Sequence, residues 1–139
     1  MLAKAKKETR LNIPVEFNLA DFNRWEAARH KFDKIFSMES FYYFENVAAA
    51  IQKVHSLLKP DGIFACVVDF YEENKASEEW PRPEHCGVPM QRFDVKQWRQ
   101  MFLDAGFKHV VQKQIRYPKE IAMEDWQAEV GSLWIQGEK

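Results

Sequence analysis

The feature that most constrains the fold is a helix-like segment followed by a turn and a nearly unbroken apolar run. Residues 46–58 place apolar side chains on one helix face, and Asn46 is a suitable N-cap. Lys59-Pro60-Asp61-Gly62 then predicts a tight turn, because Pro and Gly do not continue a helix. Residues 63–68 predict a strand buried on both faces, as in a parallel sheet. With a strand expected at 32–36, this order predicts a βαβ unit with a right-handed crossover.

The remaining segments complete an α/β pattern in a single domain over residues 1–139. The other expected elements are a helix over 2–10, a strand over 15–19, a short helix capped by Asp21 that runs through Trp25 to Ala28, a helix from Asp94 to Ala105, and strands over 109–117 and 131–137. The polar stretch 71–89 is expected to leave the sheet, and residues 118–129 to form a docked helix or turn. Strands 15–19, 32–36 and 63–68 should be parallel and the last two antiparallel, which predicts a mixed sheet with helices on both faces.

Composition and charge exclude several classes of protein. The formal net charge of the 139 residues is −1, which gives no reason to expect a nucleic-acid partner. No run of about 20 apolar residues could span a membrane, and the basic start lacks the apolar stretch of a secretory signal. Cys66 and Cys86 lack the spacing of a metal site. We therefore expect no metal, reduced thiols and a cytoplasmic protein.

Four motifs occur in an order that resembles one family. Phe32-Asp33-Lys34-Ile35-Phe36-Ser37-Met38-Glu39 is similar to its fourth strand, and residues 57–62 are similar to its Leu-Lys-Pro-Gly-Gly turn, with Asp61 in place of the first glycine. Residues 70–90 resemble the excursion after its fifth strand, and residues 98–107 resemble its helix, Ala-Gly-Phe and strand. The family is that of class I S-adenosylmethionine (SAM)-dependent methyltransferases, in its small-molecule branch. The resemblance runs from Val15 onward and implies a Rossmann-like methyltransferase fold that ends in an antiparallel strand pair.

Two features of that family have no counterpart in this sequence. Its first strand ends in a Gly-x-Gly-x-Gly turn that lets the backbone approach the cofactor, and its second strand ends in an acidic residue for the ribose. Nothing here matches either feature, and the sequence has five glycines in all. Residues 1–5 resemble the helix after the second strand. The resemblance therefore implies a partial domain that lacks the first two strands, with weak or absent SAM binding by this chain alone.

The resemblance assigns five residues to the cofactor. Asp21 and Phe22 occupy the position where the family contacts adenine; the alternative is a helix cap with Phe22 in the core. Ser37, Met38 and Glu39 stand at the carboxyl end of a predicted parallel strand, where ligands of open α/β sheets bind. Glu39 is the strongest candidate among them, and its alternative is a surface residue at a strand end.

Four further residues are candidates for the substrate side of the site. Tyr42 and Tyr43 could wall the pocket near the sulfonium methyl group, where aromatic faces suit a cation; the alternative is that they belong to the core. Tyr71 and Asn74 follow the strand at 63–68 and could orient the substrate. No catalytic residue is assigned, because positioning an already activated methyl group supplies most of the rate effect.

Three functions remain open at this stage. The first is a SAM-dependent methyltransferase, or the C-terminal part of one, that acts on a small-molecule acceptor. The second is a non-catalytic relic of the same fold that works as an interaction module or needs a complementing chain, and the third is an unrelated α/β binding domain. In addition, the strand at 32–36 should not remain a bare edge. Either 15–19 pairs with it or a second copy covers it in a homodimer.

Overall fold

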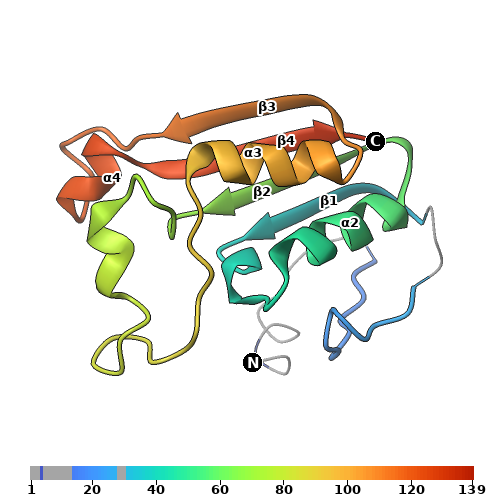
Figure 1. Cartoon of the computed structure of the whole chain (residues 1–139), viewed down its shortest axis with the longest axis horizontal. Helices are drawn as coiled ribbons and strands as arrows, with labels where there is room; N and C mark the ends of the chain where they lie inside the picture. Colours follow the sequence, from blue (N-terminus) through green and yellow to red (C-terminus); the bar gives the residue numbers. More distant parts are fainter. Residues whose placement is uncertain (1–3, 5–13, 28–30) are drawn as a thin grey trace.

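A computed structural model of the chain describes Lys4, residues 14–27 and residues 31–139. Its helices and strands are β1 (Phe32–Met38), α2 (Val47–Leu57), β2 (Leu58–Val68), α3 (Val95–Asp104), β3 (Lys108–Ile115), α4 (Asp125–Glu129) and β4 (Ser132–Glu138), with 3-10 turns at Phe41–Tyr43 and Lys75–Glu79. Among these residues the strands form one sheet in the order β1-β2-β4-β3 (Figure 1). β1 and β2 are parallel, and β4 is antiparallel to both β2 and β3. The predicted mixed sheet is confirmed.

The βαβ unit forms as the sequence predicts. The side chain of Asn46 accepts a hydrogen bond of 2.9 Å from the amide of Ala49 and caps α2. Ile51 and Val54 on the apolar side of that helix are fully buried. The expected turn at 59–62 is an irregularity at the start of β2, where the pairing with β1 shifts and Asp61 adopts a positive φ of 61°.

The second long helix also agrees with its sequence signals. Asp94 and Gln97 form a reciprocal capping box at the start of α3, with hydrogen bonds of 2.7 and 2.9 Å between each side chain and the other residue's amide. Trp98 and Phe102 are fully buried on its apolar side. After the helix, Gly106 has a φ of 97°, a conformation that glycine adopts without strain.

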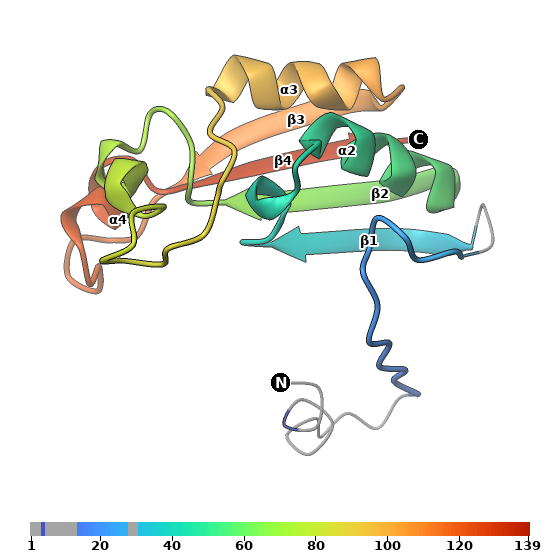
Figure 2. The ribbon, with the colours of Figure 1, turned by 60° about the horizontal axis from the view of Figure 1, so that its bottom comes forward.

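The two long helices cover the same face of the sheet. Figure 2 shows α2 and α3 side by side above β2, β3 and β4. The core between helices and sheet contains Phe64, Val68, Leu133 and Ile135. On the opposite face Phe36 is 60% exposed, so the expectation of helices on both faces is not met by the described residues. The predicted burial of the strand at 63–68 on both sides is confirmed, because Phe64 to Val68 are all buried. The apolar run carried no information on which segment covers the second side.

Two predictions for the N-terminal part are wrong. Residues 14–20 form no strand; Val15 and Leu19 are exposed, because alternation alone does not hold a strand that has no pairing partner. Residues 22–24 form a turn in place of the short helix, closed by bonds from the amides of Arg24 and Trp25 to the carbonyl of Asp21. The predicted helix over 2–10, apart from Lys4, and the end of the short helix at Ala28 lie outside the described residues.

Candidate functional site

The carboxyl ends of β1 and β2 meet at one edge of the sheet, because the two strands are parallel (Figure 1). Glu39 is the first residue after β1, and Asp69 is the first after β2. The amide of Glu39 donates a hydrogen bond of 3.0 Å to the carbonyl of Val67 on β2. Glu39 also has a φ of 53°, which is uncommon for a residue other than glycine and turns the chain away from the strand direction. Two carboxylates are thus held where ligands of α/β sheets bind.

The Glu39 carboxyl group lies in an unusual environment. Tyr42 donates a hydrogen bond of 2.8 Å to Oε2, while Oε1 is buried and has no hydrogen-bond partner. Burial, together with the nearby charge of Asp69, raises the pKa of Glu39 to about 7, and hydrogen bonding from Tyr42 and from the backbone of Asp69 opposes this shift. Glu39 can therefore take up or release a proton near neutral pH, which is the property required of a general base.

Asp69 was missed by the sequence analysis. Burial raises the pKa of its carboxyl group, and its Oδ1 atom is also buried without a partner. Its position directly after the buried strand was the available signal, since the end of a second parallel strand lies beside the end of the first. Cys66, whose thiol is buried near Glu39, has a raised pKa and is therefore a neutral part of the core.

Ser37 and Met38, the other two candidates on β1, lie on opposite faces of the sheet. Ser37 is buried on the helix-covered side, where its hydroxyl is 2.7 Å from that of Ser40. Met38 is 63% exposed on the uncovered side. Successive strand residues alternate between faces, so these two cannot contact the same part of one ligand directly.

Asp21 and Phe22 lie in the turn that precedes β1. The Phe22 ring packs against Phe44, with 5.6 Å between ring centroids, and it borders a hollow of about 360 Å³ that Trp25 and Phe32 also line. Asp21 accepts a hydrogen bond of 2.9 Å from the amide of Asn23 and is otherwise largely exposed. Among the described residues, no hydrogen bond or ion pair joins Asp21 to Glu39.

Lys53 of α2 fixes this turn in place. Its ammonium group donates hydrogen bonds of 2.6, 3.1 and 2.6 Å to the carbonyl oxygens of Phe22, Asn23 and Trp25. A Lys53→Met variant keeps the aliphatic stem but leaves these carbonyls without their charged donor. The amide of Trp25 should then exchange with deuterium at least about tenfold faster, because hydrogen bonds to a charged group contribute about 1.5–3 kcal/mol. A Lys96→Met variant, at an exposed position of α3, is the control, and equal exchange in both variants would contradict this role.

The four substrate-side candidates occupy different environments. Tyr43 is 47% exposed, with its ring centroid 4.6 Å from that of Tyr42. Tyr71 is fully buried; its hydroxyl donates to the Gly131 carbonyl at 2.7 Å and accepts from Gln114. Asn74 is also fully buried, and its amide donates to the Asp69 carbonyl at 2.8 Å. Tyr43 is accessible to a ligand, whereas the burial of Tyr71 and Asn74 gives both a structural task in this conformation.

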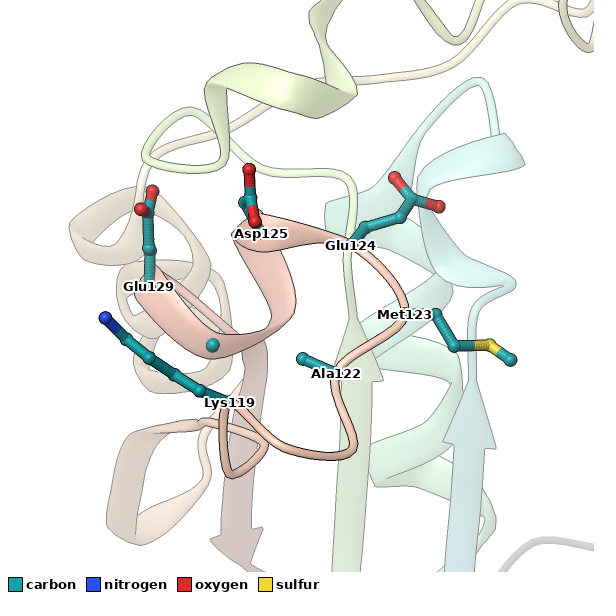
Figure 3. A pocket seen from close by; sticks show the side chains of 7 residues that line it. Lys119, Ala122, Met123, Glu124, Asp125 and Glu129 are labelled. Atoms are coloured by element: carbon teal, nitrogen blue, oxygen red, sulfur yellow. The ribbon is translucent and has the colours of Figure 1, made fainter.

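An acidic hollow beside α4 is too small for a cofactor. It has a volume of about 150 Å³, below the roughly 300–1,000 Å³ of typical ligand sites. Figure 3 shows Asp125 and Glu129 pointing to the same side of α4. Glu124 accepts a hydrogen bond of 2.9 Å from the Trp126 indole and serves the local structure. Across the part of the chain that the structure describes, no three His, Cys, Asp or Glu side chains group in a way that could hold a metal.

Comparisons with known proteins decide the family. A family model described as a methyltransferase domain matches residues 5–113. The chain belongs to the class I SAM-dependent methyltransferases. A methyltransferase of Haloferax volcanii, solved in complex with the Trm112 methyltransferase activator, is 30% identical with a TM-score of 0.81, over 99% of this chain and 67% of that one. The [4+2]-cyclase SpnF shares the fold with a TM-score of 0.70 at 16% identity, over 99% of this methyltransferase chain and 60% of the cyclase.

A curated relative is "Phosphoethanolamine N-methyltransferase 3" of Arabidopsis thaliana, which is 29% identical over 105 residues. That match covers 73% of this methyltransferase chain but spans only 20% of the relative's length. The match to a cyclase shows that the fold alone does not define the reaction. In the described residues of this chain, no helix is long and apolar enough to cross a membrane.

SAM is the cofactor that the family implies, and the carboxyl edge of β1 and β2 fits part of it. Glu39 Oε1 and Asp69 Oδ1 are buried acceptors without a partner, which suits a ligand that carries positive charge or N–H donors. The Gly-x-Gly-x-Gly turn that would approach the rest of the cofactor does not occur in the sequence. The buried acceptors are therefore compatible with a cationic or N–H-donating group at this place, whereas the rest of the cofactor has no counterpart among the described residues.

Proposed function

We propose that this domain takes part in SAM-dependent methyl transfer to a small-molecule acceptor in the cytoplasm, at the carboxyl edge of β1 and β2. The observation that supports it most is the Glu39–Tyr42 pair, a carboxyl group with a pKa of about 7 at the edge where α/β folds bind ligands. The near-neutral net charge of −1 favours a small acceptor over a nucleic acid.

The bound cofactor supplies an activated methyl group. Glu39 accepts the proton that the acceptor loses, and Tyr42 holds the carboxyl group in one orientation through its hydrogen bond. Tyr43 offers an exposed aromatic face to a cationic centre. In this proposal Asp21 and Phe22 contact the adenine, held in place by Lys53, and Ser37 and Met38 border the cofactor from the two faces of β1.

An amine is the acceptor that we propose to test first. The charge of Asp69 raises the pKa of Glu39, so a protonated amine between the two carboxyl groups would relieve their repulsion. The amine becomes a nucleophile once it gives a proton to Glu39, and its nitrogen then forms the bond to the methyl group as the bond from methyl to sulfur breaks. The Arabidopsis relative is named for methyl transfer to the nitrogen of phosphoethanolamine, which supports the same class.

The test is transfer of a tritiated methyl group from SAM to phosphoethanolamine and to simple alkylamines by the purified chain. A Glu39→Gln variant should be slower by roughly 10²-fold or more, as expected for loss of a general base. Glu45→Gln, which changes an exposed carboxylate just before α2, should leave the rate unchanged. Equal rates for the two variants would remove Glu39 from the site. Transfer to none of these amines, either by the chain alone or with the activator described below, would reject the acceptor class.

A second candidate function is that of a subunit that needs a partner chain for activity. The supporting observation is that the similar Haloferax methyltransferase was solved with an activator. Addition of purified Haloferax volcanii Trm112 to the same assay distinguishes the two candidates. A rise in rate of tenfold or more would favour partner dependence, and a measurable rate that Trm112 leaves unchanged would favour activity of the chain alone.

A further inference from the structure

The segment between β2 and α3, residues 69–94, leaves the sheet and returns to it (Figure 1). Asn74 lies near the start of this segment and has no exposed surface. Its side-chain amide donates a hydrogen bond of 2.8 Å to the main-chain carbonyl of Asp69, the first residue after β2. Its Oδ1 atom is buried and accepts no hydrogen bond from the described residues. An amide buried in this way is costly to the fold, so an asparagine at this position needs a task that an apolar side chain cannot perform.

Asp69 is the residue on which the Asn74 side chain acts. Two further hydrogen bonds hold Asp69: its backbone amide donates to the Glu39 carboxyl group, and its own carboxyl group accepts from the Ser132 hydroxyl on β4. Together with the bond from Asn74, these contacts come from three different parts of the fold. They fix both the main chain and the side chain of Asp69.

The position of Asp69 beside Glu39 has an electrostatic cost. Burial, and then the charge of Asp69, raises the pKa of Glu39. The other titratable groups that interact with Glu39 are Tyr42 and the neutral thiol of Cys66. Within the described part of the chain, neither carboxylate forms an ion pair with a cation. Two like charges move apart unless the chain holds them, and the buried bond from Asn74 to the main chain is suited to this task.

Arg92 supports Asn74 from the other end of the segment. Its guanidinium group donates hydrogen bonds of 3.4 and 3.3 Å to the main-chain carbonyls of Glu72 and Asn74, and its side chain is only 16% exposed. The Asn74 carbonyl also accepts a hydrogen bond of 2.7 Å from the Ser77 hydroxyl. The turn that carries Asn74 is therefore held at its main chain as well as through the Asn74 side chain.

We propose that Asn74 is a positioning residue, which holds the Asp69 carboxylate beside Glu39 and so maintains the pair of carboxyl groups that receives a cationic amine. Asn74 does not touch the amine, because its side chain is enclosed, and it acts through Asp69. Loss of its bond frees the chain after β2, and repulsion from Glu39 then turns the Asp69 carboxylate away. The amine-binding part of this inference rests on the proposed function, whereas the placement of Asp69 does not.

The experiment measures the pKa of Glu39 by carbon NMR of the purified chain, isotopically labelled at its glutamate side chains, with Glu39→Gln to assign the signal. Asn74→Ala should lower this pKa by at least about half a unit, because the charge of Asp69 then acts from farther away. Ser77→Ala removes another buried hydrogen bond from the same segment, one that does not involve Asp69, and should leave the pKa unchanged. In an Asp69→Asn background, Asn74→Ala should change the pKa of Glu39 no further.

A second variant covers the case in which Asn74→Ala does not fold, which circular dichroism shows. Arg92→Lys keeps the charge but loses the planar group that reaches both carbonyls, and it should lower the pKa of Glu39 in the same direction. An unchanged pKa in folded Asn74→Ala, or in Arg92→Lys where Asn74→Ala does not fold, would overturn the proposal. An equal shift in Ser77→Ala, or a further shift in the Asp69→Asn background, would overturn it as well.

Methyl transfer is measured separately, so that this inference and the proposed function can fail independently. In a chain that transfers methyl groups, Asn74→Ala should raise the KM for phosphoethanolamine at least about tenfold, and Ser77→Ala should leave it unchanged. An equal KM in both variants would reject the amine-binding part of the inference. A lowered pKa of Glu39 in Asn74→Ala, with no methyl transfer by the parent chain, would reject the proposed function and leave Asn74 as the residue that positions Asp69.

Discussion

A Gly131→Ala variant should lose at least about 3 kcal/mol of folding free energy. Gly131 has a φ of +78°, and a Cβ atom added to it would collide with the backbone carbonyl of Ile115. A backbone atom cannot swing aside as the end of a flexible side chain can. The residue also joins three parts of the fold, because its amide bonds to the Trp126 carbonyl at 2.8 Å and its carbonyl accepts the Tyr71 hydroxyl. The collision would therefore disturb α4, the end of β3 and the buried tyrosine together.

Urea denaturation of the variant measures this loss, and Gly87→Ala provides a matched control. Gly87 has a similar φ of +63°, but an added Cβ atom there would meet nothing closer than the Pro83 Cα at 3.5 Å. That variant should lose only about 1–2 kcal/mol, from the positive φ alone. A comparable loss in both variants would show that backbone conformation, and not the close approach to Ile115, makes glycine necessary at position 131.

The elements that were predicted correctly are those whose signals are local. Asn46 and Asp94 cap helices through bonds to residues three positions later, so a short window of sequence contains both partners of each bond. Pro60 and Gly62 likewise mark the end of α2. Residues 59–62 form an irregular start to β2, however, and not a separate turn. These features depend little on the rest of the fold.

The features that the sequence did not predict depend on contacts between residues that are distant in the sequence. Val15 and Leu19 alternate with polar residues as strand residues do, but in the structure no strand pairs with them and they remain exposed. Tyr71, a candidate for orienting a substrate, is fully buried and donates a hydrogen bond to the carbonyl of Gly131, sixty positions away. For the candidate site, the family resemblance indicated Glu39, whereas Asp69 became evident only from the pairing of β1 with β2.

A second large effect on folding stability is expected from the Glu39 carboxyl group. Its pKa is raised from 4.5 to about 7 in the folded protein, mainly by burial, so the folded state binds this proton more tightly than the unfolded state does. Stability therefore falls as the pH rises between these two values, and the full penalty is present above about 7. A Glu39→Gln variant has no proton to lose but can still accept the hydrogen bond from Tyr42. It should be more stable than the parent chain above that pH, by on the order of 2 kcal/mol.

Thermal denaturation at a series of pH values checks this prediction. The parent chain should lose stability between pH 4.5 and about 7, and the Gln variant should lose much less. Glu45→Gln, on an exposed side chain, should follow the parent. Parallel pH profiles for the parent and Glu39→Gln would show that Glu39 is solvated. A variant that is more stable but slower in methyl transfer identifies a carboxylate retained for chemistry at a cost to the fold, because a purely structural residue would lower stability when replaced.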